Sequence, residues 1–315
     1  MVTSGIDRIY ISVRDMDESL AFYRDIVGMA VVADQELDSK KIQHLWGLPK
    51  GTRARAVFLK NEDQPTLLEL IQFDPHSGKF IRGGAKIWDY GIYDIAFTVK
   101  DLEKTYEKLI GRGFTFITPP TPFSPTYFGE LSADFHTKFS ICLGPNEMAI
   151  PHMQLITPPP PEMKRDYGRI MDSVQMVENM EEALRFYRDL LGLSVVTDAT
   201  FPKGLMDKIL HLPQGTEGRI ALLNLEGSEA PFLELIELSV KGKSLSDIAK
   251  PPNLGIFMIS FKTDSLIKLM ERFENEGTPI LSGPLELTIQ PLGKIRRIEV
   301  EGPSKVRIEF FEQEA

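Results

Sequence analysis

Hydrophobic and polar residues follow the same order four times along the chain. Each time, a short run with alternating apolar positions leads into an acidic or Ser residue able to cap a helix, and apolar residues at helical spacing come next. Several runs typical of β-strands follow each predicted helix. The pattern predicts helices near residues 17–26, 101–112, 180–191 and 265–276, in four modules of one strand, one helix and three strands.

The second half of the chain repeats the first. SLAFYRDIVGMAVVAD aligns with EALRFYRDLLGLSVVTD, so that Phe22 and Gly28 match Phe186 and Gly192, each 164 residues later. LPKGTRAR and LPQGTEGR match at the same offset. Repeated modules of this size bury their apolar faces only against a neighbour, so we expect the four modules to pair. Pairing within each half, across the halves or between chains is left open.

Length and composition fit two globular domains. A chain of 315 residues exceeds one ordinary core, and hydrophobic and charged fractions of 42% and 26% are those of a folded soluble protein. The Pro-rich segment 158–166 would act as a stiff linker. We predict a first domain at 1–157, with modules 1–82 and 83–157, and a second at 167–315, with modules 167–243 and 244–315.

Charge and targeting signals favour a small-molecule partner. The net charge of -9 would repel nucleic-acid phosphates, and no Lys/Arg stripe interleaved with aromatic residues occurs. The first residues lack a basic-then-apolar signal pattern, and no apolar run reaches the roughly 18 residues that span a bilayer. We therefore expect no membrane association and a cytoplasmic location. The lone Cys142, in an alternating apolar strand, is interpreted as a core residue.

Two motifs recur in fixed places within the modules. D-m-x-x-[SA]-L-x-F-Y-R-D-x-[VL]-G follows the first strand, and L-E-L lies in the closing strand. With the βαβββ order, they resemble the vicinal oxygen chelate superfamily of glyoxalases, epimerases, extradiol dioxygenases and antibiotic-resistance proteins. The resemblance covers nearly the whole chain and implies an α+β fold in which paired modules form two cup-shaped mixed β-sheets. Since that fold hosts many chemistries, it implies no single reaction.

The resemblance also points to eight site positions. In the superfamily, each module places one metal ligand on its first strand, usually a His seven residues before the residue that opens the helix. A second ligand, usually Glu, lies on the last strand. None of the four first-strand positions here holds His. The positions are Arg8 and Glu69 in module one, Asp94 and Gln154 in module two, Asp172 (or Ser173, with a bulge) and Glu234 in module three, and Met258 and Glu309 in module four.

Carboxylates dominate these positions. Glu69, Asp94, Glu234 and Glu309 are therefore candidate ligands of a divalent metal, with Mg, Mn, Zn and Ni considered, and their hard oxygen atoms suit Mg or Mn better than Zn. The two-His-one-carboxylate set of an iron extradiol dioxygenase is missing from the positions, so we exclude that reaction. Glu234 and Glu309 have a second interpretation, as solvated or Arg-paired remnants of an ancestral site.

Pairing within the first half would place Arg8 beside Glu69 and Asp94. A guanidinium keeps its charge at physiological pH and would take the place of a divalent cation. His152, two residues before Gln154 on one strand, would face the same cup. The predicted catalytic set has Arg8 stabilising an oxyanion, Glu69 or Asp94 acting as base, and His152 orienting or protonating the substrate. The alternative is that His152 is an ordinary strand residue.

Substrate-binding residues are expected on cup-facing strands and in one insertion. Gly113 to Gly144 spans 31 residues, against 25 from Gly277 to Gly302. The longer stretch is either a lid over the cup or an irregular loop packed on its own domain. The candidate substrate-binding residues are Tyr10, Ser12, Gln154, Tyr127 and His136.

Two functions are predicted. The first is an enzyme of lyase or isomerase type that stabilises an enolate or oxyanion of a small keto, hydroxy or diol substrate in the first-domain cup. The second is a non-catalytic protein that sequesters a small molecule, as bleomycin-resistance proteins do, and an apolar cup with carboxylates for a cationic ligand would favour it. A homodimer is left open.

Overall fold

The structure, a computed structural model, describes residues 3–61, 64–123, 136–157, 163–201, 203–204, 206–207 and 210–314. The first half contains β1 (Thr3–Val13), α1 (Met16–Tyr23), β2 (Ala30–Glu36), α2 (Ser39–Trp46), β3 (Arg53–Lys60), β4 (Leu67–Asp74), β5 (Gly91–Val99), α3 (Leu102–Ile110), β6 (Thr115–Phe123), β7 (His136–Leu143) and β8 (Ala149–Thr157). The second half contains β9 (Tyr167–Met176), α4 (Met180–Leu184), β10 (Ser194–Phe201), β11 (Gly218–Asn224), β12 (Phe232–Leu238), β13 (Gly255–Thr263), α5 (Leu266–Glu276), β14 (Ile280–Ile289), β15 (Gly293–Glu301) and β16 (Arg307–Gln313).

The four predicted helices form, and each begins at the expected cap. The side chains of Asp15, Asp101, Asn179 and Ser265 each accept a hydrogen bond from the backbone N–H three residues later, which satisfies one free donor at the helix start. In module three, a π-helical segment, Arg185–Leu190, continues α4. The predicted spans are confirmed to within a few residues.

The modules pair across the halves of the sequence. One eight-stranded sheet has the order β14-β15-β16-β13-β1-β4-β3-β2, and the other has the order β10-β11-β12-β9-β5-β8-β7-β6. Module one therefore pairs with module four through antiparallel β1 and β13, and module two pairs with module three through β5 and β9. The sequence segments 1–157 and 167–315 each supply one module to each sheet.

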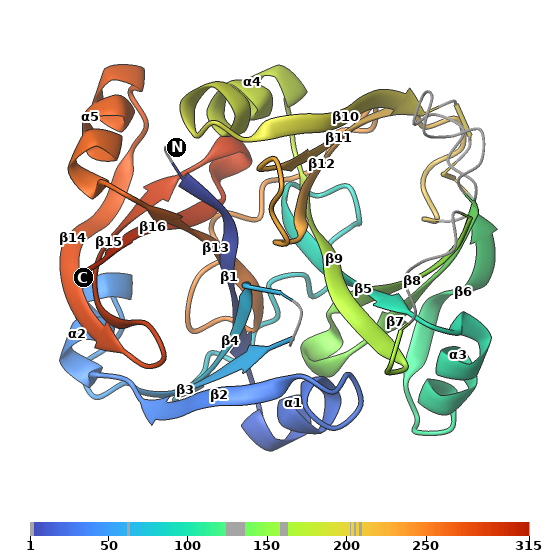
Figure 1. The fold of residues 1–315 in the computed structure, drawn as a ribbon, viewed down its shortest axis with the longest axis horizontal. Coiled ribbons are helices and arrows are strands. Elements are labelled where there is room, and N and C mark those ends of the chain that lie inside the picture. Colours follow the sequence, from blue (N-terminus) through green and yellow to red (C-terminus); the bar gives the residue numbers. More distant parts are fainter. Residues whose placement is uncertain are drawn as a thin grey trace.

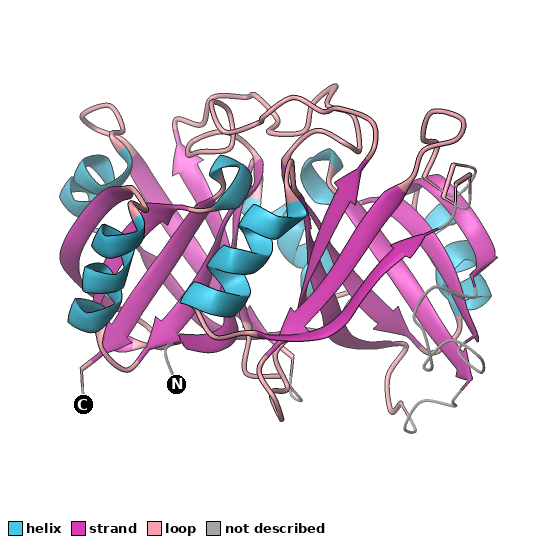
Figure 2. Ribbon diagram, turned by 90° about the horizontal axis from the view of Figure 1, so that it is seen from above, coloured by secondary structure: helices cyan, strands magenta, loops and turns pink. Residues whose placement is uncertain are grey.

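Each sheet curls into a cup, and the two cups lie side by side (Figure 1). We name them the β1/β13 cup and the β5/β9 cup after their central strand pairs. Helices pack on the outer faces of the curled sheets (Figure 2), except that α2 borders the inside of the β1/β13 cup. The largest buried cluster joins apolar residues of α1, α3, α4 and α5 to strands of both sheets, so one shared core holds the two cups together. The predicted α+β fold of two cups is confirmed.

The concave faces of the cups remain separate from this shared core. Tyr10, Phe58 and Phe257 belong to a second cluster inside the β1/β13 cup. Smaller clusters around Val174 and Phe139 line the β5/β9 cup. In the described part of the chain, no helix is both long and apolar enough to cross a bilayer.

Candidate functional site

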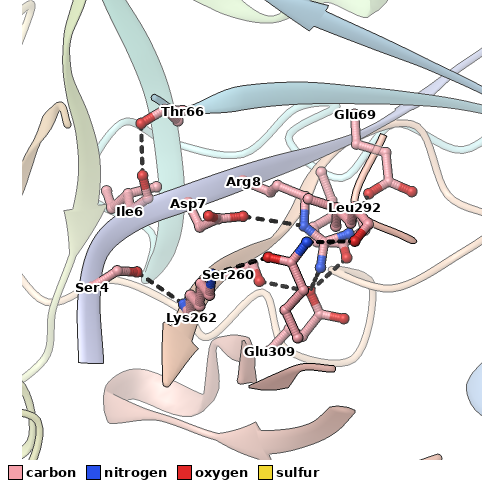
Figure 3. A network of polar contacts seen from close by, with 12 residues as sticks. Ser4, Ile6, Asp7, Arg8, Thr66, Glu69, Ser260, Lys262, Leu292 and Glu309 are labelled. Atoms are coloured by element: carbon pink, nitrogen blue, oxygen red, sulfur yellow. Dashed lines mark hydrogen bonds and ion pairs between the residues drawn. The ribbon is translucent and has the colours of Figure 1, made fainter. Parts of the chain in front are cut away.

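The β1/β13 cup holds a buried arginine between two carboxylates. Arg8 is fully buried on β1, and its Nη1 donates to Glu69 Oε2 at 3.0 Å while its Nη2 donates to Glu309 Oε2 at 2.5 Å. Figure 3 shows the guanidinium of Arg8 extending between these side chains. Glu69 and Glu309 come from β4 and β16, the strands that flank the central pair. Arg8 thus contacts the last-strand positions of both modules in this cup.

Glu309 is the most highly coordinated carboxylate of this cup. Tyr10 Oη and Ser260 Oγ each donate to its Oε2 at 2.6 Å, and Arg297 Nε forms an ion pair with its Oε1 at 2.7 Å. Arg297 also contacts Glu299 at 3.3 Å. Together with Arg8 and Glu69, these side chains form one connected polar network on the floor of the cup.

Mutual attraction sets the charges of this network. Burial alone would lower the pKa of Arg8, but Glu309 and Glu69 outweigh it and raise that pKa above its ordinary value. Burial likewise favours a protonated Glu309, yet Arg297 and Arg8 together lower the pKa of this carboxyl. Glu69 has less compensation, so its burial raises its pKa to about 7 despite the attraction of Arg8. Arg8 and Glu309 therefore remain an ion pair at neutral pH.

A cavity of about 180 Å³ lies above the network, bounded by Tyr10, Glu69, Arg297 and the helix α2. Helix α2 was not predicted from the sequence, although Asp38 at its N-cap and the αL Gly47 at its C-cap are recognisable signals. The side chain of Gln35 bonds to the backbone of Gln290 and so links β2 to the end of β14. Gln35 Nε2 donates to the carbonyl oxygen of Gln290 at 2.8 Å, and Gln35 Oε1 accepts from the N–H of Gln290 at 3.3 Å. This cup is narrow and partly closed.

The β5/β9 cup contains a larger and far more apolar cavity, with a volume of about 270 Å³. Among the described lining residues, the carboxyl groups lie at the floor of this cavity. The described lining consists of Ile87, Tyr93, Asp94, Ala96, Phe139, Ile141, Pro151, Met153, Met171, Asp172, Val174, Met176, Val196, Thr197, Phe201, Met206, Leu210, Ile220, Leu222, Phe232, Glu234, Ile236 and Leu238.

Three adjacent strands bring Asp94, Asp172 and Glu234 together. Val174 on β9 lies opposite Asp94 of β5 on one side and opposite Glu234 of β12 on the other. Asp172 is two residues from Val174 and therefore points to the same face. Diagonal neighbours of this kind lie about 7–8 Å apart at the backbone, within reach of each other's side chains. All three carboxyl groups face the cavity.

Burial and mutual repulsion favour the neutral forms of these carboxyls. Burial raises the pKa of Asp172 to about 7. Burial also raises the pKa of Asp94 well above its usual value, with a further rise from the neighbouring Asp172 that Arg82 only partly offsets. The pKa of Glu234 is raised by burial and then by the two aspartates. Carboxyls with pKa values shifted toward neutrality are typical of acid–base sites.

The predicted first-half cup of Arg8, Glu69, Asp94 and His152 does not form. Arg8 and Glu69 belong to one sheet, whereas Asp94 and His152 belong to the other. The prediction failed because it assumed pairing within a half. In the structure, Arg8 contacts Glu309 of the last module as well as Glu69. Glu309 is therefore paired with an arginine, which was the second interpretation of this residue.

His152 and Gln154 lie on the wrong face of β8 for the cup. In module one, Ile11 of β1 pairs with Leu70, and in module two the equivalent Phe97 of β5 pairs with His152. His152 therefore corresponds to Leu70. The residue before it, Pro151, corresponds to Glu69. A shift of one residue in register moves every side chain to the opposite face. His152 is fully buried there, with Nε2 at 3.1 Å from Tyr167 Oη, and burial lowers its pKa to about 3.

Gln154 has a helix-anchoring role instead. Its Oε1 accepts from the backbone N–H of Leu102 at the start of α3 at 3.0 Å. The corresponding Gln72 and Glu312, each three residues after a cup-facing Glu, accept in the same way from Met16 and Leu266 at the starts of α1 and α5. The predicted role of Gln154 in substrate binding is therefore wrong.

The remaining predicted binding residues are spread apart. Tyr10 is bonded within the Arg8 network, and Ser12 is fully buried with no hydrogen-bond partner for its Oγ among the described residues. His136 is exposed at the start of β7. Tyr127 lies outside the described residues, so the choice between a lid and a loop stays open.

Neither cup, as described, gathers a metal-binding set. In the β1/β13 cup, Arg8 binds both Glu69 and Glu309, which leaves no room in charge or space for a cation. In the β5/β9 cup, the oxygen atoms of Asp94 and Glu234 have the right chemistry for Mg or Mn. However, nowhere in the described ranges do three His, Cys, Asp or Glu side chains lie close enough to hold a metal ion.

Comparisons with known proteins agree with this architecture. The chain belongs to the Glyoxalase/Bleomycin resistance protein/Dioxygenase superfamily, whose family model matches residues 5–129 and 168–310. The structure is similar to that of glyoxalase I from Zea mays, with a TM-score of 0.64 and 16% identity over 98% of this chain and 93% of that one. It is also similar to a putative dioxygenase from Bacillus subtilis, with a TM-score of 0.60 and 11% identity over 100% of this chain and 86% of that one. No curated protein matches the sequence. At such identities the structural likeness establishes the fold alone.

Proposed function

We propose that this protein is an enzyme of the lyase or isomerase type that moves a proton within a small molecule bound in the β5/β9 cup. The supporting observation is the convergence of Asp94, Asp172 and Glu234 on the floor of a cavity of about 270 Å³. This places the reaction in a different cup from the one that the sequence suggested, because the Arg8 network fills the floor of the β1/β13 cup.

The proposal rests on how a cluster of buried carboxyls handles protons. A general acid–base residue works best when its pKa lies near the working pH, and burial raises the pKa of Asp172 to about 7. Asp94 and Glu234 provide acceptors beside it, so one carboxyl can hold a proton while another is ionised. Such a pair removes a proton at one carbon atom and returns it at a neighbouring atom.

Deuterium exchange tests this proposal without a known substrate. A panel of small hydroxyketones, diols and 2-keto acids, including aromatic members that match the apolar wall, would be incubated with the protein in D2O and followed by NMR. We expect deuterium to appear on the carbon next to the carbonyl of at least one compound, and Asp172→Asn to abolish the exchange. The control is Glu69→Gln, which changes a buried carboxyl of the other cup and should leave the exchange intact.

A second function, sequestration without chemistry, is supported by the apolar lining of the cavity. The described lining residues include many Met, Phe, Leu and Ile side chains and no Lys or Arg able to stabilise a developing enolate. Tight binding of a panel compound with no deuterium exchange at any pH would favour sequestration over catalysis. A cytoplasmic location, a divalent metal and a homodimer remain predictions.

A further inference from the structure

The β5/β9 cavity carries acidic groups with no basic side chain beside them in its lining. Asp94, Asp172 and Glu234 face it, and no Lys, Arg or His is among its described lining residues. In the β1/β13 cup, by contrast, Glu69 and Glu309 each contact a guanidinium group. A buried carboxyl is ionised only at a large cost unless a cation lies beside it. A cation bound in the β5/β9 cup would therefore favour the ionised forms of its carboxyls, as Arg297 and Arg8 do for Glu309 in the other cup.

Two of these acidic groups also have unused hydrogen-bonding atoms. Asp94 and Asp172 are 2% and 3% exposed, and the Oδ1 atom of each has no hydrogen-bond partner among the described residues. Buried polar atoms are nearly always paired, so two free acceptors on one cavity floor point to a donor that comes from outside the chain. Both atoms belong to side chains that border the cavity.

The nearest arginine does not supply this donor. Arg82 is already committed to backbone carbonyl oxygens, with its Nε donating to Ile92 at 3.0 Å and its Nη2 to Asp89 at 2.9 Å. Its guanidinium stacks on the ring of Tyr93, 4.9 Å from the centroid. Arg82 therefore holds the start of β5 and is not among the described residues that line the cavity.

We propose that the ligand of the β5/β9 cup is a compact apolar molecule that carries a protonated amine. The ammonium group would lie on the floor and donate to carboxyl oxygen atoms there, with Asp94 and Asp172 offering unpaired acceptors and Glu234 adding negative charge nearby. The apolar part would lie against the wall. This inference rests on the proposed function only in taking the β5/β9 cup as the site of action.

The wall of the cavity suits an apolar body of variable shape. Met153, Met171, Met176 and Met206 line it, and methionine side chains adapt to irregular ligands because they are unbranched and polarizable. Met206 belongs to the connection between β10 and β11, which also reaches across to β6 through His211, whose Nε2 lies 3.1 Å from the carbonyl oxygen of Ile117. Met206 and Leu210 of this connection line the cavity and add to its apolar surface.

Three probes of nearly equal size separate charge from shape. Isothermal titration at neutral pH would compare 4-phenylbutylamine, 4-phenylbutan-1-ol and 4-phenylbutyrate, which share the same apolar body and differ in the charge of the polar end. We expect the amine to bind about tenfold or more tightly than the alcohol, which corresponds to about 1.4 kcal/mol or more, and the carboxylate not to bind. This comparison uses the unmodified protein, so it does not depend on the folding of a variant.

Variants then identify the carboxyl groups that bind the ammonium group of the probe. Asp94→Asn and Glu234→Gln should each weaken binding of the amine by about tenfold while changing the affinity for the alcohol by less than about threefold. Glu69→Gln, in the other cup, should change neither. Equal affinities for amine and alcohol, or undiminished amine binding in the Asp94→Asn/Glu234→Gln double variant, would overturn the inference, as would displacement of the amine by Mg²⁺ at equimolar concentration.

The outcomes also distinguish this inference from the proposed function. Selective amine binding without deuterium exchange in any panel compound would support the ligand class and contradict the proton-transfer enzyme. Exchange that depends on Asp172 in a neutral ketone, with no preference for the amine probe, would support the enzyme and contradict the ligand class.

Discussion

Arg8 and Glu309, 301 residues apart in the chain, form an ion pair of 2.5 Å in which both side chains are fully buried. The pair joins the first module to the last at the positions where the superfamily places metal ligands. Since Arg8 also contacts Glu69, one guanidinium bridges the carboxyl groups of two modules. A covalently attached cation thus occupies these positions and links the ends of the chain.

Removing Arg8 should destabilise the whole protein. Arg8→Met keeps much of the side-chain volume but leaves Glu69 buried without its partner, and breaking a buried ion pair costs about 3–5 kcal/mol. Urea unfolding at neutral pH measures the change in free energy. Arg53→Met is the control, because Arg53 pairs with Asp74 on the surface and such pairs contribute about 0–1 kcal/mol. Similar losses in both variants would contradict a structural role for the buried pair.

Exchanging Arg8 for His should create a metal site. Arg8→His places an imidazole beside Glu69 and Glu309, and a nitrogen with two carboxylate ligands suits Zn²⁺ or Ni²⁺. Because a metal that binds only the folded state stabilises it, the melting temperature of the variant should rise on addition of Zn²⁺. The unmodified protein should show no such rise, since Arg8 already occupies the position. An equal rise in both proteins would show that Arg8 does not stand in for a cation.

The sequence predicted the repeated elements well but not their partners. Apolar spacing and the caps at Asp15 and Asp101 are local signals, and these located the helices. The pairing of β1 with β13 is a contact between residues about 250 positions apart. Because the four modules share one order of elements, several module pairings fit the pattern of hydrophobic and polar residues equally well. The composition of each cup depends on that choice, so Arg8 was correctly placed beside Glu69 but was assigned Asp94 in place of Glu309 as its second neighbour.

The predicted site residues of module two were also wrong for a second, more local reason. The last-strand position in module two was assigned to Gln154, but Pro151 occupies it, and no Glu marks the register in that strand. An error of three residues reverses the face, which is why His152 was predicted to face the cup. Arg297 was also missed, although the alternation of KIRRIEVE places Arg297 and Glu299 on one face of β15, where they form an ion pair at 3.3 Å.

The carboxyl floor of the β5/β9 cup should cost stability at neutral and higher pH. Asp172 has its pKa raised from 3.8 to about 7 in the folded protein, so folding favours its protonated form. The unfolded chain loses this proton as pH rises above about 4, and stability then falls until the folded group ionises near pH 7. Asp172→Asn should therefore be more stable than the unmodified protein at pH 7, by at most about 4 kcal/mol, with the difference vanishing below about pH 4.

Urea unfolding at several pH values measures this difference. Asp198→Asn is the control of opposite sign, because Asp198 bonds to Arg219 at 2.6 Å and this bond lowers its pKa. That substitution should be neutral or slightly destabilising at pH 7. A loss of stability in Asp172→Asn at pH 7 would mean that the carboxyl is ionised and paired in the folded state.

His152 should make the fold sensitive to acid. Burial lowers its pKa from 6.5 to about 3, so the folded state keeps the imidazole neutral while the unfolded chain takes up a proton below pH 6.5. Stability is thus fully present above pH 6.5 and falls with decreasing pH, by at most about 1.4 kcal/mol per pH unit, until pH 3. His152→Leu, which copies Leu70 of module one, should reduce this slope between pH 6 and pH 4, whatever its effect at neutral pH. An unchanged slope in urea unfolding would show that the imidazole is not buried as a neutral group.

The pairing across halves predicts that neither half folds alone as a monomer. An isolated chain of residues 1–162 would have β1 and β5 without their partners β13 and β9, leaving unpaired strand edges on both sheets. Each half, expressed separately, should aggregate or pair with a second copy, whereas both halves expressed together should form a one-to-one complex. The full chain cleaved after residue 162 is the control and should remain associated. Size-exclusion chromatography with light scattering gives the masses, and a folded monomer of residues 1–162 would contradict the sheet order, because pairing within a half would then suffice.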